Sequence, residues 1–466
     1  MKLINNYIEA SLDHKFSDDE YRAFEKLFRG AIKHSKVNIE TKRIDKLKEW
    51  LLSLNSLRHK TGRFFTIRAI SVKLCDRKWF QPIIDQSEIG VLALLGTIRN
   101  NRIEFLVKLK IEPGNINYIQ LSPTIQATKS NYEKVHKGKS VQFIELINNE
   151  KNKDFTLLDC LLSEQNSKFM KKKNRNIIKI VDPNSLKLDH NSVWLTIGQI
   201  KQLSQKDNIV NMDLRSIISG FSFLNIDFEE CYSKGKKDYK DYNLYKYELR
   251  NYNQDKINIL VSKLYDYIKK KHINIEYVNF NQLANWSVFG GSIEHNEKKY
   301  FKVIGAKIDL TGREVQCWEQ PLIQSVKSEH NVLIYYKDSN SIQLLVQFKM
   351  EIGATLIAEI GPTIQTSNYN IKNQNENFLY DLYKLKKYDH KFSVKQSDEG
   401  GRFYHDVHQN TLIEVSENQK NYIHSYVNSD RYHWIELGNI IELIKKGGPI
   451  NMQLRGILSM ITPEVI

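Results

Sequence analysis

Residues 112–132 read EPGNINYIQLSPTIQATKSNY, and residues 351–369 read EIGATLIAEIGPTIQTSNY. The positions that match carry Glu, Gly, Pro, Thr, Gln, Asn and Tyr, whereas two cores that resemble each other by chance do so through Leu and Val. The chain therefore repeats a polar stretch, and the repeat preserves something other than core packing.

The similarity between the two stretches extends over most of the chain. Residues 79–126 align with residues 318–365 without a gap, from a Trp-x-Gln-Pro pattern to Pro-Thr-Ile-Gln. Residues 194–215 match residues 434–455 at Trp, Gly, Asn, Met, Leu and Arg. We interpret the pattern as the duplication of a whole domain, because a period of about 240 residues is far longer than that of a solenoid repeat.

Length and composition agree with two folded domains. A chain of 466 residues is too long for one ordinary core, and 41% hydrophobic residues with only 8 prolines describe a folded protein. We predict an N-terminal domain over residues 1–225, and a connector plus C-terminal domain over residues 226–466. No apolar run reaches the roughly 18 residues of a membrane span, and the start lacks a signal peptide's apolar centre, so we expect a cytoplasmic protein.

The net charge of +15 is compatible with an anionic ligand. Clustered Lys and Arg would favour a nucleic-acid backbone through counterion release, so a non-catalytic nucleic-acid-binding protein is one interpretation. The lysines, however, form short runs in polar segments such as 171–175 and 269–271, which is typical of a solvated surface. A smaller anion such as a pyrophosphate fits the same field.

The periodicity of apolar residues predicts a mixed chain of helices and strands. We expect two helices within residues 18–55, extended structure after them, and a hairpin that turns at Asn100 and Asn101. The four cysteines lie far apart without a Cys-x-x-Cys pair, so we expect buried free thiols and no zinc site. Further along the chain we expect a strand over 176–181, helices over 196–205, 211–219 and 254–272, and a Tyr- and Lys-rich connection over 231–256.

Several longer motifs resemble those of a known family, the nucleotide-diphosphate hexose 2,3-dehydratases of deoxysugar biosynthesis. The N-terminal half carries EPGNINYIQLSPTIQATKSNYEKVHKG, SEQNSKFMKKKNRN at 163–176, WLTIGQI at 194–200 and DNIVNMDLRS at 207–216. The C-terminal half carries REVQCWEQPLI at 313–323, EGGRFYH at 399–405 and NMQLRGILS at 451–459. The resemblance covers nearly the whole chain.

The resemblance implies an α+β subunit of two tandem Nudix-hydrolase-like domains that arose by duplication and assemble as a homodimer. It implies a nucleotide-sugar pocket in each domain, with only one pocket active. The resemblance implies a 4-keto-6-deoxyhexose linked to a nucleotide as the substrate, with dTDP as the nucleotide. Loss of water across C2 and C3 gives a 3,4-diketo-2,6-dideoxy sugar for a downstream ketoreductase.

This reaction needs a base near C3, hydrogen-bond donors around the C4 oxygen and an acid near C2. The C4 ketone acidifies the C3 hydrogen, and no electrons pass to a cofactor. No glycine-rich dinucleotide fingerprint follows a predicted strand, and the metal-binding Nudix box is missing. We therefore expect neither a redox cofactor nor a catalytic metal.

The first copy of the repeated stretch is the expected working pocket. The second copy lacks the Asn-Ile-Asn core of residues 115–117, is shorter before its Asn-Tyr pair, and has no counterpart of Val-His-Lys-Gly at 135–138. We therefore place the active pocket in the N-terminal domain and expect a vestigial pocket in the C-terminal one.

Glu112, Tyr132 and His136 are the candidate catalytic residues. Glu112 closes an apolar strand before a Pro-Gly turn and suits acid or base chemistry, although a repeated glutamate can equally bind backbone amides. His136 exchanges protons near neutral pH, and the alternative is an incidental loop histidine. Tyr132 can donate to the C4 oxygen or to a phosphate, and the alternative is a partly buried tyrosine with a satisfied hydroxyl.

The candidate substrate-binding residues supply aromatic, amide, hydroxyl and cationic groups. Lys173 and Arg175 suit a pyrophosphate, because a guanidinium contacts two oxygens at once, whereas the alternative is a solvated charge run. Trp79 can stack on a base or pack in the core, and Asn211 and Arg215 can belong to pocket or scaffold. The full set is Trp79, Gln126, Thr128, Lys129, Ser130, Asn131, Lys173, Arg175, Asn211 and Arg215.

The competing enzyme is a Nudix-like pyrophosphatase that cleaves nucleotide sugars. It would need clustered metal carboxylates, which the sequence lacks. Release of a nucleoside monophosphate that stops with a chelator would favour it over the dehydratase.

Overall fold

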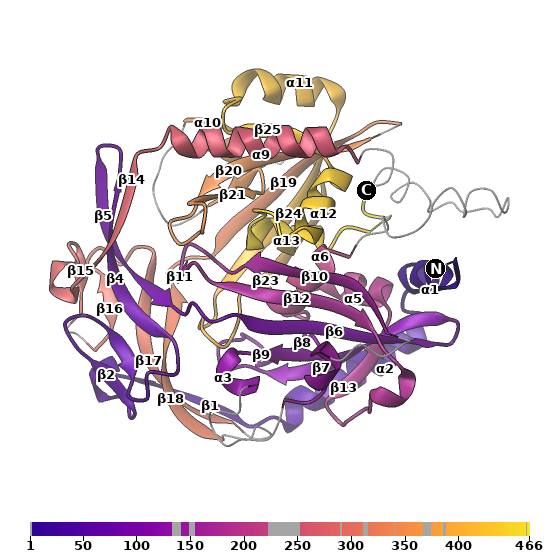
Figure 1. Ribbon diagram of the computed structural model, residues 1–466, viewed down its shortest axis with the longest axis horizontal. Coiled ribbons are helices and arrows are strands. Elements are labelled where there is room, and N and C mark those ends of the chain that lie inside the picture. The colour runs from indigo at the N-terminus through magenta and orange to yellow at the C-terminus, as the bar shows by residue number, and fades with distance from the viewer. Residues whose placement is uncertain are drawn as a thin grey trace.

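The computed structural model describes residues 2–132, 141–148, 154–221, 252–288, 291–310, 316–339, 341–366, 374–384, 388–462 and 464–466. Two seven-stranded sheets dominate the fold, and two smaller sheets lie beside them. Figure 1 shows the large sheet of the first half below that of the second half. The molecule is a mixed α+β protein, as predicted.

The first large sheet has the strand order β10-β12-β6-β7-β13, with β8 beside β7 and β9 beside β6. The β6–β7 hairpin turns at Asn100 and Asn101, whose φ angles of 49° and 58° suit a tight turn, so the predicted hairpin is confirmed. The strands are β6 (Gly90–Arg99), β7 (Arg102–Ile111), β8 (Ile119–Ser122), β9 (Ile125–Ala127), β10 (Phe155–Ser163), β12 (Lys173–Ile180) and β13 (Ser192–Leu195).

The second large sheet repeats this topology strand for strand. Its order is β23-β24-β19-β20, with β25 and β21 beside β20 and β22 beside β19. Strand β24 runs parallel to β19, as β12 runs parallel to β6. The strands are β19 (Glu329–Lys337), β20 (Ile342–Met350), β21 (Ala358–Gly361), β22 (Ile364–Gln365), β23 (Asp389–Ser397), β24 (Val407–Val415) and β25 (Tyr432–Glu436).

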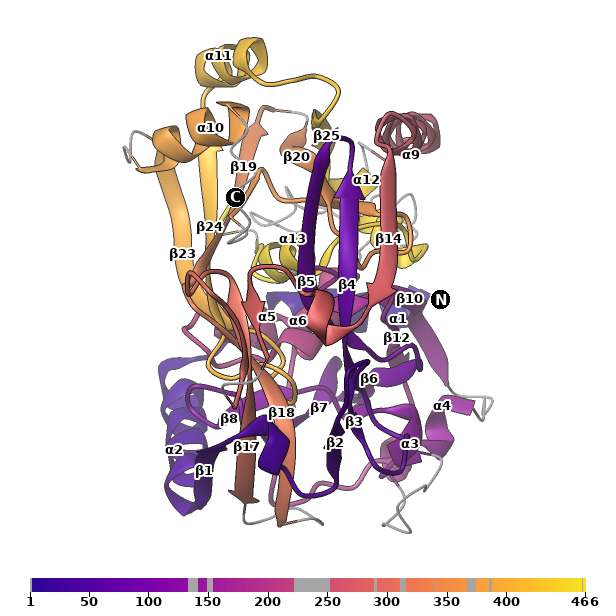
Figure 2. The same cartoon turned by 90° about the vertical axis from the view of Figure 1, so that its left-hand side faces the viewer.

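The two small sheets exchange strands between the halves, as Figure 2 shows. Strand β1 (Val37–Lys42) of the first half pairs with β17 (Phe301–Leu310), and β14 (Ile273–Val278) of the second half pairs with β4 (Thr66–Leu74). Each small sheet is therefore incomplete without the other half. The remaining strands are β2 (Trp50–Leu52), β3 (Leu57–His59), β5 (Arg77–Asp85), β11 (Phe169–Met170), β15 (Trp286–Ser287), β16 (Ile293–His295) and β18 (Cys317–Ser325).

The prediction of two helices within residues 18–55 is half wrong. Helix α2 (Asp18–His34) begins at a capping box formed by Ser17 and Glu20. Residues beyond it form β1 and β2 instead of a second helix. The backbone of β1 bonds along its whole length to β17, which is more than 250 residues away. The local periodicity of apolar residues carries no information about so distant a partner.

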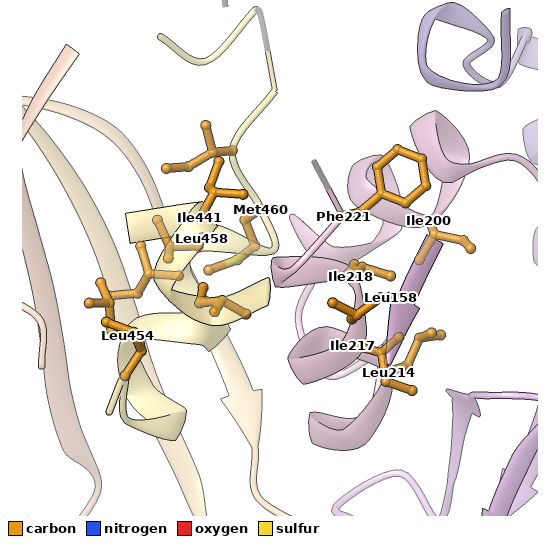
Figure 3. Packing of buried hydrophobic residues seen from close by; sticks show 14 of the residues in the cluster. Leu158, Ile200, Leu214, Ile217, Ile218, Phe221, Ile441, Leu454, Leu458 and Met460 are labelled. Atoms are coloured by element: carbon orange, nitrogen blue, oxygen red, sulfur yellow. The ribbon is translucent and has the colours of Figure 1, made fainter. Parts of the chain in front are cut away.

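The hydrophobic core joins the two halves through helices α6 (Met212–Ser219) and α13 (Met452–Leu458). Figure 3 shows Leu214, Ile217 and Ile218 on one side and Leu454 and Leu458 on the other. A polar bond crosses between the two helices, where Arg455 Nε donates to Ser216 Oγ at 3.1 Å. The contact between α6 and α13 thus connects the two sheets through one continuous core.

The other helices surround this centre. The predicted helices are confirmed as α5 (Ile197–Ser204), α6 and α9 (Gln254–Lys269), whereas nearly all of the predicted 231–256 connection lies outside the described residues. Cys160 is buried as expected, but Cys75 and Cys317 are exposed. No helix within the described residues is long and apolar enough to cross a membrane. Further helices are α1 (Lys2–Asp13), α3 (Lys129–Tyr132), α4 (Glu145–Asn148), α10 (Gln374–Lys384), α11 (Glu417–Tyr426) and α12 (Leu437–Lys445).

Candidate active site

The repeated polar stretch forms a hydrogen-bonded network, which we call the first site. Gln126 Nε2 donates to Glu112 Oε1 at 2.9 Å, and Asn211 Nδ2 donates to Gln126 Oε1 at 3.0 Å. Lys110 Nζ forms an ion pair with Glu112 Oε1 at 2.9 Å. Asn211 also caps α6 by accepting from the amide of Leu214. Three predicted residues, Glu112, Gln126 and Asn211, therefore lie together.

The second copy of the stretch forms an equivalent network, which we call the second site. Gln365 Nε2 donates to Glu351 Oε1 at 2.9 Å, and Asn451 Nδ2 donates to Gln365 Oε1 at 2.7 Å. Asn451 caps α13 as Asn211 caps α6. The matched Glu, Gln and Asn of the sequence repeat thus have the same structural role in both halves.

Each site is completed by a segment of the other half. We call residues 397–407 the second-half arm and residues 163–173 the first-half arm. At the first site, Gly114 N donates to Gly400 O at 2.7 Å, and His405 N donates to Gly114 O at 2.8 Å. At the second site, Gly353 N donates to Asn166 O at 2.9 Å, and the amide of Lys171 donates to Gly353 O. The two arms therefore cross between the halves.

Conserved positions of the internal repeat hold the arms in place. Arg215 Nη2 donates to Ser397 O at 2.5 Å, and Arg455 Nη2 donates to Ser163 O. Burial lowers the pKa of Arg215 to about 10, which still leaves it charged at neutral pH. Arg215, predicted to bind substrate or to support the scaffold, here bonds the backbone of the second-half arm.

The Trp-x-Gln-Pro pattern also supports the arms. Trp79 Nε1 donates to Gln81 Oε1 at 3.2 Å, and Gln81 Nε2 donates to Ser167 O of the first-half arm at 3.2 Å. Trp318 and Gln320 repeat the arrangement toward Gly401 O of the second-half arm. The structure thus places Trp79 in the small sheet, packed with the cluster around Met170, and on the side of the second site.

The two sites differ in their acidic residues. The arms align residue by residue, so Glu399 occupies at the first site the position that Gln165 occupies at the second. On the helices, Asp213 corresponds to Gln453. The first site therefore has carboxyl groups at two positions where the second site has amides. Sequence reasoning missed Asp213 and Glu399, although both lie within motifs that we had quoted.

Burial changes the proton affinity of these carboxyl groups. Burial, reinforced by the charges of Glu164, Glu399 and Glu112, raises the pKa of Asp213 well above its ordinary value. Burial also raises the pKa of Glu399, and the nearby Arg402 only partly opposes that shift. Buried carboxyl groups with raised pKa values are candidates for acid–base chemistry.

A buried ion cluster fastens the first-half arm to the second half. Lys168 Nζ forms an ion pair with Asp406 and bonds Ser325 Oγ at 3.0 Å, and His408 Nε2 lies 2.7 Å from Asp398 Oδ2. Burial alone would lower the pKa of Lys168, but the surrounding carboxylates outweigh it and raise that pKa. Asp398, Asp406 and His408 have the spacing of metal ligands, yet Lys168 already pairs with Asp406, and the neighbouring Asp398 helps to raise the pKa of His408 to about 9 in spite of its burial.

Other predicted residues lie elsewhere on the first half. Tyr132 donates to Ile89 O at 3.3 Å and packs in the cluster around Phe143, and Thr128 and Lys129 precede it at the start of α3. His136 and the side chains of Ser130 and Asn131 lie outside the described residues. Tyr132 is therefore near the start of β6, and not within the Glu112 network.

The two predicted pyrophosphate ligands lie on β12. Arg175 forms a bidentate pair with Asp159, with Nε and Nη2 bonds of 2.8 and 2.6 Å. Lys173 ends the first-half arm, and its charge opposes a small part of the rise in pKa that burial causes at Glu359 of the second site. The structure brings neither residue to the Glu112 network.

Replacing Glu359 by Gln should stabilise the protein at high pH. Burial and the nearby Glu351 raise the pKa of Glu359 from 4.5 to about 7, so between these pH values the unfolded chain ionises more readily than the folded one. The destabilisation grows as the pH rises from 4.5 through 7. We expect Glu359→Gln to gain about 1–3 kcal/mol in urea unfolding at pH 8 and almost nothing near pH 4.5.

The equivalent position of the first site provides the control for Glu359→Gln. Gln120 Nε2 donates to Ser397 Oγ at 2.5 Å, and Glu359 accepts from Ser163 Oγ at 2.8 Å in the same arrangement. The reverse change, Gln120→Glu, should lower stability at pH 8. An equal stability difference at both pH values would refute the explanation.

Comparisons with known proteins give a consistent result. Residues 21–221 and 259–461 match a family described as NDP-hexose 2,3-dehydratase. A protein of Saccharopolyspora spinosa named dTDP-4-dehydro-6-deoxy-alpha-D-glucopyranose 2,3-dehydratase is 31% identical over 91% of this chain and 87% of that protein. A protein of the same name in Amycolatopsis orientalis is 29% identical over 87% of this chain and 82% of its own length.

Proposed function

This chain belongs to the NDP-hexose 2,3-dehydratase family and is an enzyme of deoxysugar biosynthesis, and we propose that its first site performs the reaction. The proposed substrate is dTDP-4-keto-6-deoxyglucose, which loses water across C2 and C3. The observation that supports the activity is the match of both halves to this family over nearly all of the chain.

The chemistry requires one group to accept the C3 proton and another to donate a proton to the departing C2 hydroxyl. The C4 ketone delocalises the charge that forms at C3, and donors near the C4 oxygen stabilise it. The first site offers buried carboxyl groups together with the cationic Lys110 and the amides of Gln126 and Asn211. The second site has amides at two of the carboxyl positions, which favours the first site as the place of proton transfer.

We propose that the subunit consists of two Nudix-like domains, 1–225 and 226–466, related by duplication. The common strand order of the two large sheets supports this proposal. The exchanged strands β1 and β14 and the two arms make each domain depend on the other. We further propose a homodimer that passes its product to a ketoreductase, on the strength of the sequence resemblance.

The activity is tested by incubating the purified chain with dTDP-4-keto-6-deoxyglucose and a ketoreductase that reduces 3,4-diketo sugars. We expect a dTDP-linked 2,6-dideoxy sugar, identified by mass and NMR. Recovery of unchanged substrate for several nucleotides would reject the dehydratase. Release of a nucleoside monophosphate that a chelator abolishes would instead indicate a pyrophosphatase.

A further inference from the structure

Three carboxyl groups and one unpaired amide surround the turn that follows β7. Glu112 lies at the start of this turn and Asn115 at its end, and Asp213 is held nearby because Asn211, which caps its helix, bonds into the Glu112 network. Glu399 belongs to the second-half arm, whose Gly400 bonds Gly114 of this turn. The four side chains come from three separate segments, and both halves contribute.

Asp213 lies in the first turn of α6 with only 4% of its surface exposed. Within the described residues its carboxyl group has neither a hydrogen bond nor an ion pair, although a buried carboxyl normally has one. Arg215 follows Asp213 by two residues on the same helix and donates a hydrogen bond to Ser397 O of the second-half arm. The helix therefore fixes Asp213 relative to the arm that carries Glu399.

Glu399 lies at the tip of the second-half arm. Its backbone carbonyl accepts from the amide of Phe403 at 3.0 Å, which closes the turn, and the adjacent Gly400 bonds Gly114. The side chain of Glu399 also has no hydrogen bond or ion pair within the part of the chain that is described. Its carboxyl group is thus held beside the first site and remains available for a ligand.

The amide of Asn115 indicates that a polar ligand occupies this place. Asn115 is fully buried, and neither of its side-chain polar atoms has a hydrogen-bond partner among the described residues. A Cβ atom added at Gly400 would lie 2.8 Å from Asn115 Cγ, so this amide lies directly against the arm. A buried amide without a partner is costly, and a hydroxyl-rich ligand such as a sugar would satisfy it. The second site has Ala354 at the equivalent position.

The second site serves as an internal comparison. Gln453 and Gln165 stand where the first site has Asp213 and Glu399. Gln453 is as buried as Asp213, whereas Gln165 is fully buried and Glu399 is partly exposed. An amide can hydrogen-bond a ligand, but it cannot accept or release a proton near neutral pH. The same framework thus carries Asp213 and Glu399 in the first site and amides at the same two positions in the second site.

We propose that Glu399, supplied by the C-terminal half, is the base that removes the C3 proton and that Asp213 is the acid that protonates the departing C2 hydroxyl. This assignment rests on the proposed dehydratase function. It makes both residues further catalytic groups of the reaction, and it makes the N-terminal site dependent on the second-half arm.

The steps balance in protons and electrons. The C3–H bond breaks, its proton joins the Glu399 carboxylate, and its electron pair forms an enediolate with the C4 oxygen. The C2–O bond then breaks as Asp213 gives its proton to the leaving group, which departs as water. Glu399 then releases the proton taken from C3 to solvent. The resulting enol loses its hydroxyl proton, which restores Asp213 through solvent, and gains a proton at C2 from solvent. The product is the 3,4-diketo sugar.

The raised proton affinities of the two carboxyl groups support these roles. The pKa of Asp213 is raised well above its ordinary value, first by burial, which favours its neutral, proton-donating form. Burial raises the pKa of Glu399, and the charge of Arg402 opposes part of that rise. The charge of Glu399 is therefore coupled to a neighbouring cation. Two carboxyl groups in different environments are a common way to divide acid and base work.

Single carboxyl-to-amide variants of the full chain test the proposal. Asp213→Asn and Glu399→Gln should each lower kcat by at least about 100-fold, because a positioned acid or base contributes that much. The fold accepts amides at both positions, as Gln453 and Gln165 show. Glu436→Gln is the control, because Glu436 lies at the start of α12, pairs with Lys256 of α9 and belongs to neither network, and it should retain kcat within about threefold.

Exchange of the C3 hydrogen separates the two roles. In heavy water, Asp213→Asn should still exchange the C3 hydrogen of the substrate while losing the elimination, and Glu399→Gln should lose both. Retention of kcat within about tenfold in either folded variant would overturn the proposal, and the opposite exchange pattern would overturn the division of roles. If Asp213→Asn does not fold, as judged by its melting curve, Asp213→Gln replaces it. Absence of dehydration by the unmodified enzyme would instead reject the proposed function.

Discussion

Replacing Gly114 by Ala is expected to destabilise the protein by more than about 3 kcal/mol and to abolish activity. A Cβ atom at this position would overlap the carbonyl oxygen of Phe403 and lie 2.7 Å from that of Gly400. Both obstacles are backbone atoms of the second-half arm, so no side-chain rotation can relieve them. The arm would have to leave the first site. Chemical denaturation and turnover of the variant measure the two effects.

Gly30 provides the matched control for Gly114. It lies within α2, and a Cβ atom added there meets nothing within 4 Å. Gly30→Ala should therefore leave the protein as stable as before, or stabilise it by up to about 1 kcal/mol, because Ala favours helices. A Gly114→Ala variant as stable and active as Gly30→Ala would show that the arm is not tightly seated.

Replacing Lys168 by Met should cost about 3–5 kcal/mol of unfolding free energy. The side chain of Lys168 is 4% exposed, and its ammonium group lies among the carboxylates of Asp406, Asp398 and Glu329. Removal of the cation leaves the buried carboxylates with His408 as their remaining cationic partner, which compensates only part of their charge. The loss should shrink as the pH falls, because protonation of the carboxylates removes that charge. Urea unfolding at several pH values measures both effects.

An exposed ion pair gives the comparison for Lys168. Lys270 pairs with Asp430 at 3.1 Å, and both side chains are 61% exposed. Lys270→Met should change stability by less than about 1 kcal/mol, as exposed pairs contribute little. Similar losses for the two Met variants would mean that the buried cluster does not fasten the arm.

Local features of the fold were predictable from the sequence, and long-range ones were not. The turn at Asn100 and Asn101 and the helix that starts at Asn211 have signatures within a few residues of themselves. Strand β1 has no such signature, because its structure depends on a partner in the other half. The polar network of Glu112 was predicted as a site because the repeat draws attention to it.

The rest of the candidate site depends on the two arms. An alignment of the two halves does not reveal that each arm lies at the site of the other half. Glu399 belongs to the C-terminal half, so a search for partners of Glu112 in its own domain could not find it. Comparing the two copies for carboxyl-to-amide differences, Asp213 against Gln453 and Glu399 against Gln165, would have given the signal. Arg175 was predicted as a pyrophosphate ligand, but it pairs with Asp159. That pairing cannot be predicted unless the pairing of β10 with β12 is known.

Analysis of the product formed in heavy water tests the lyase chemistry of this chain most directly. If C3 loses its hydrogen to a protein base and the enol is reprotonated at C2, the product trapped by the ketoreductase carries one solvent deuterium at C2. Mass spectrometry and NMR locate that label. A product without deuterium at C2, or a nucleoside monophosphate in place of a deoxysugar, would contradict dehydration at the first site.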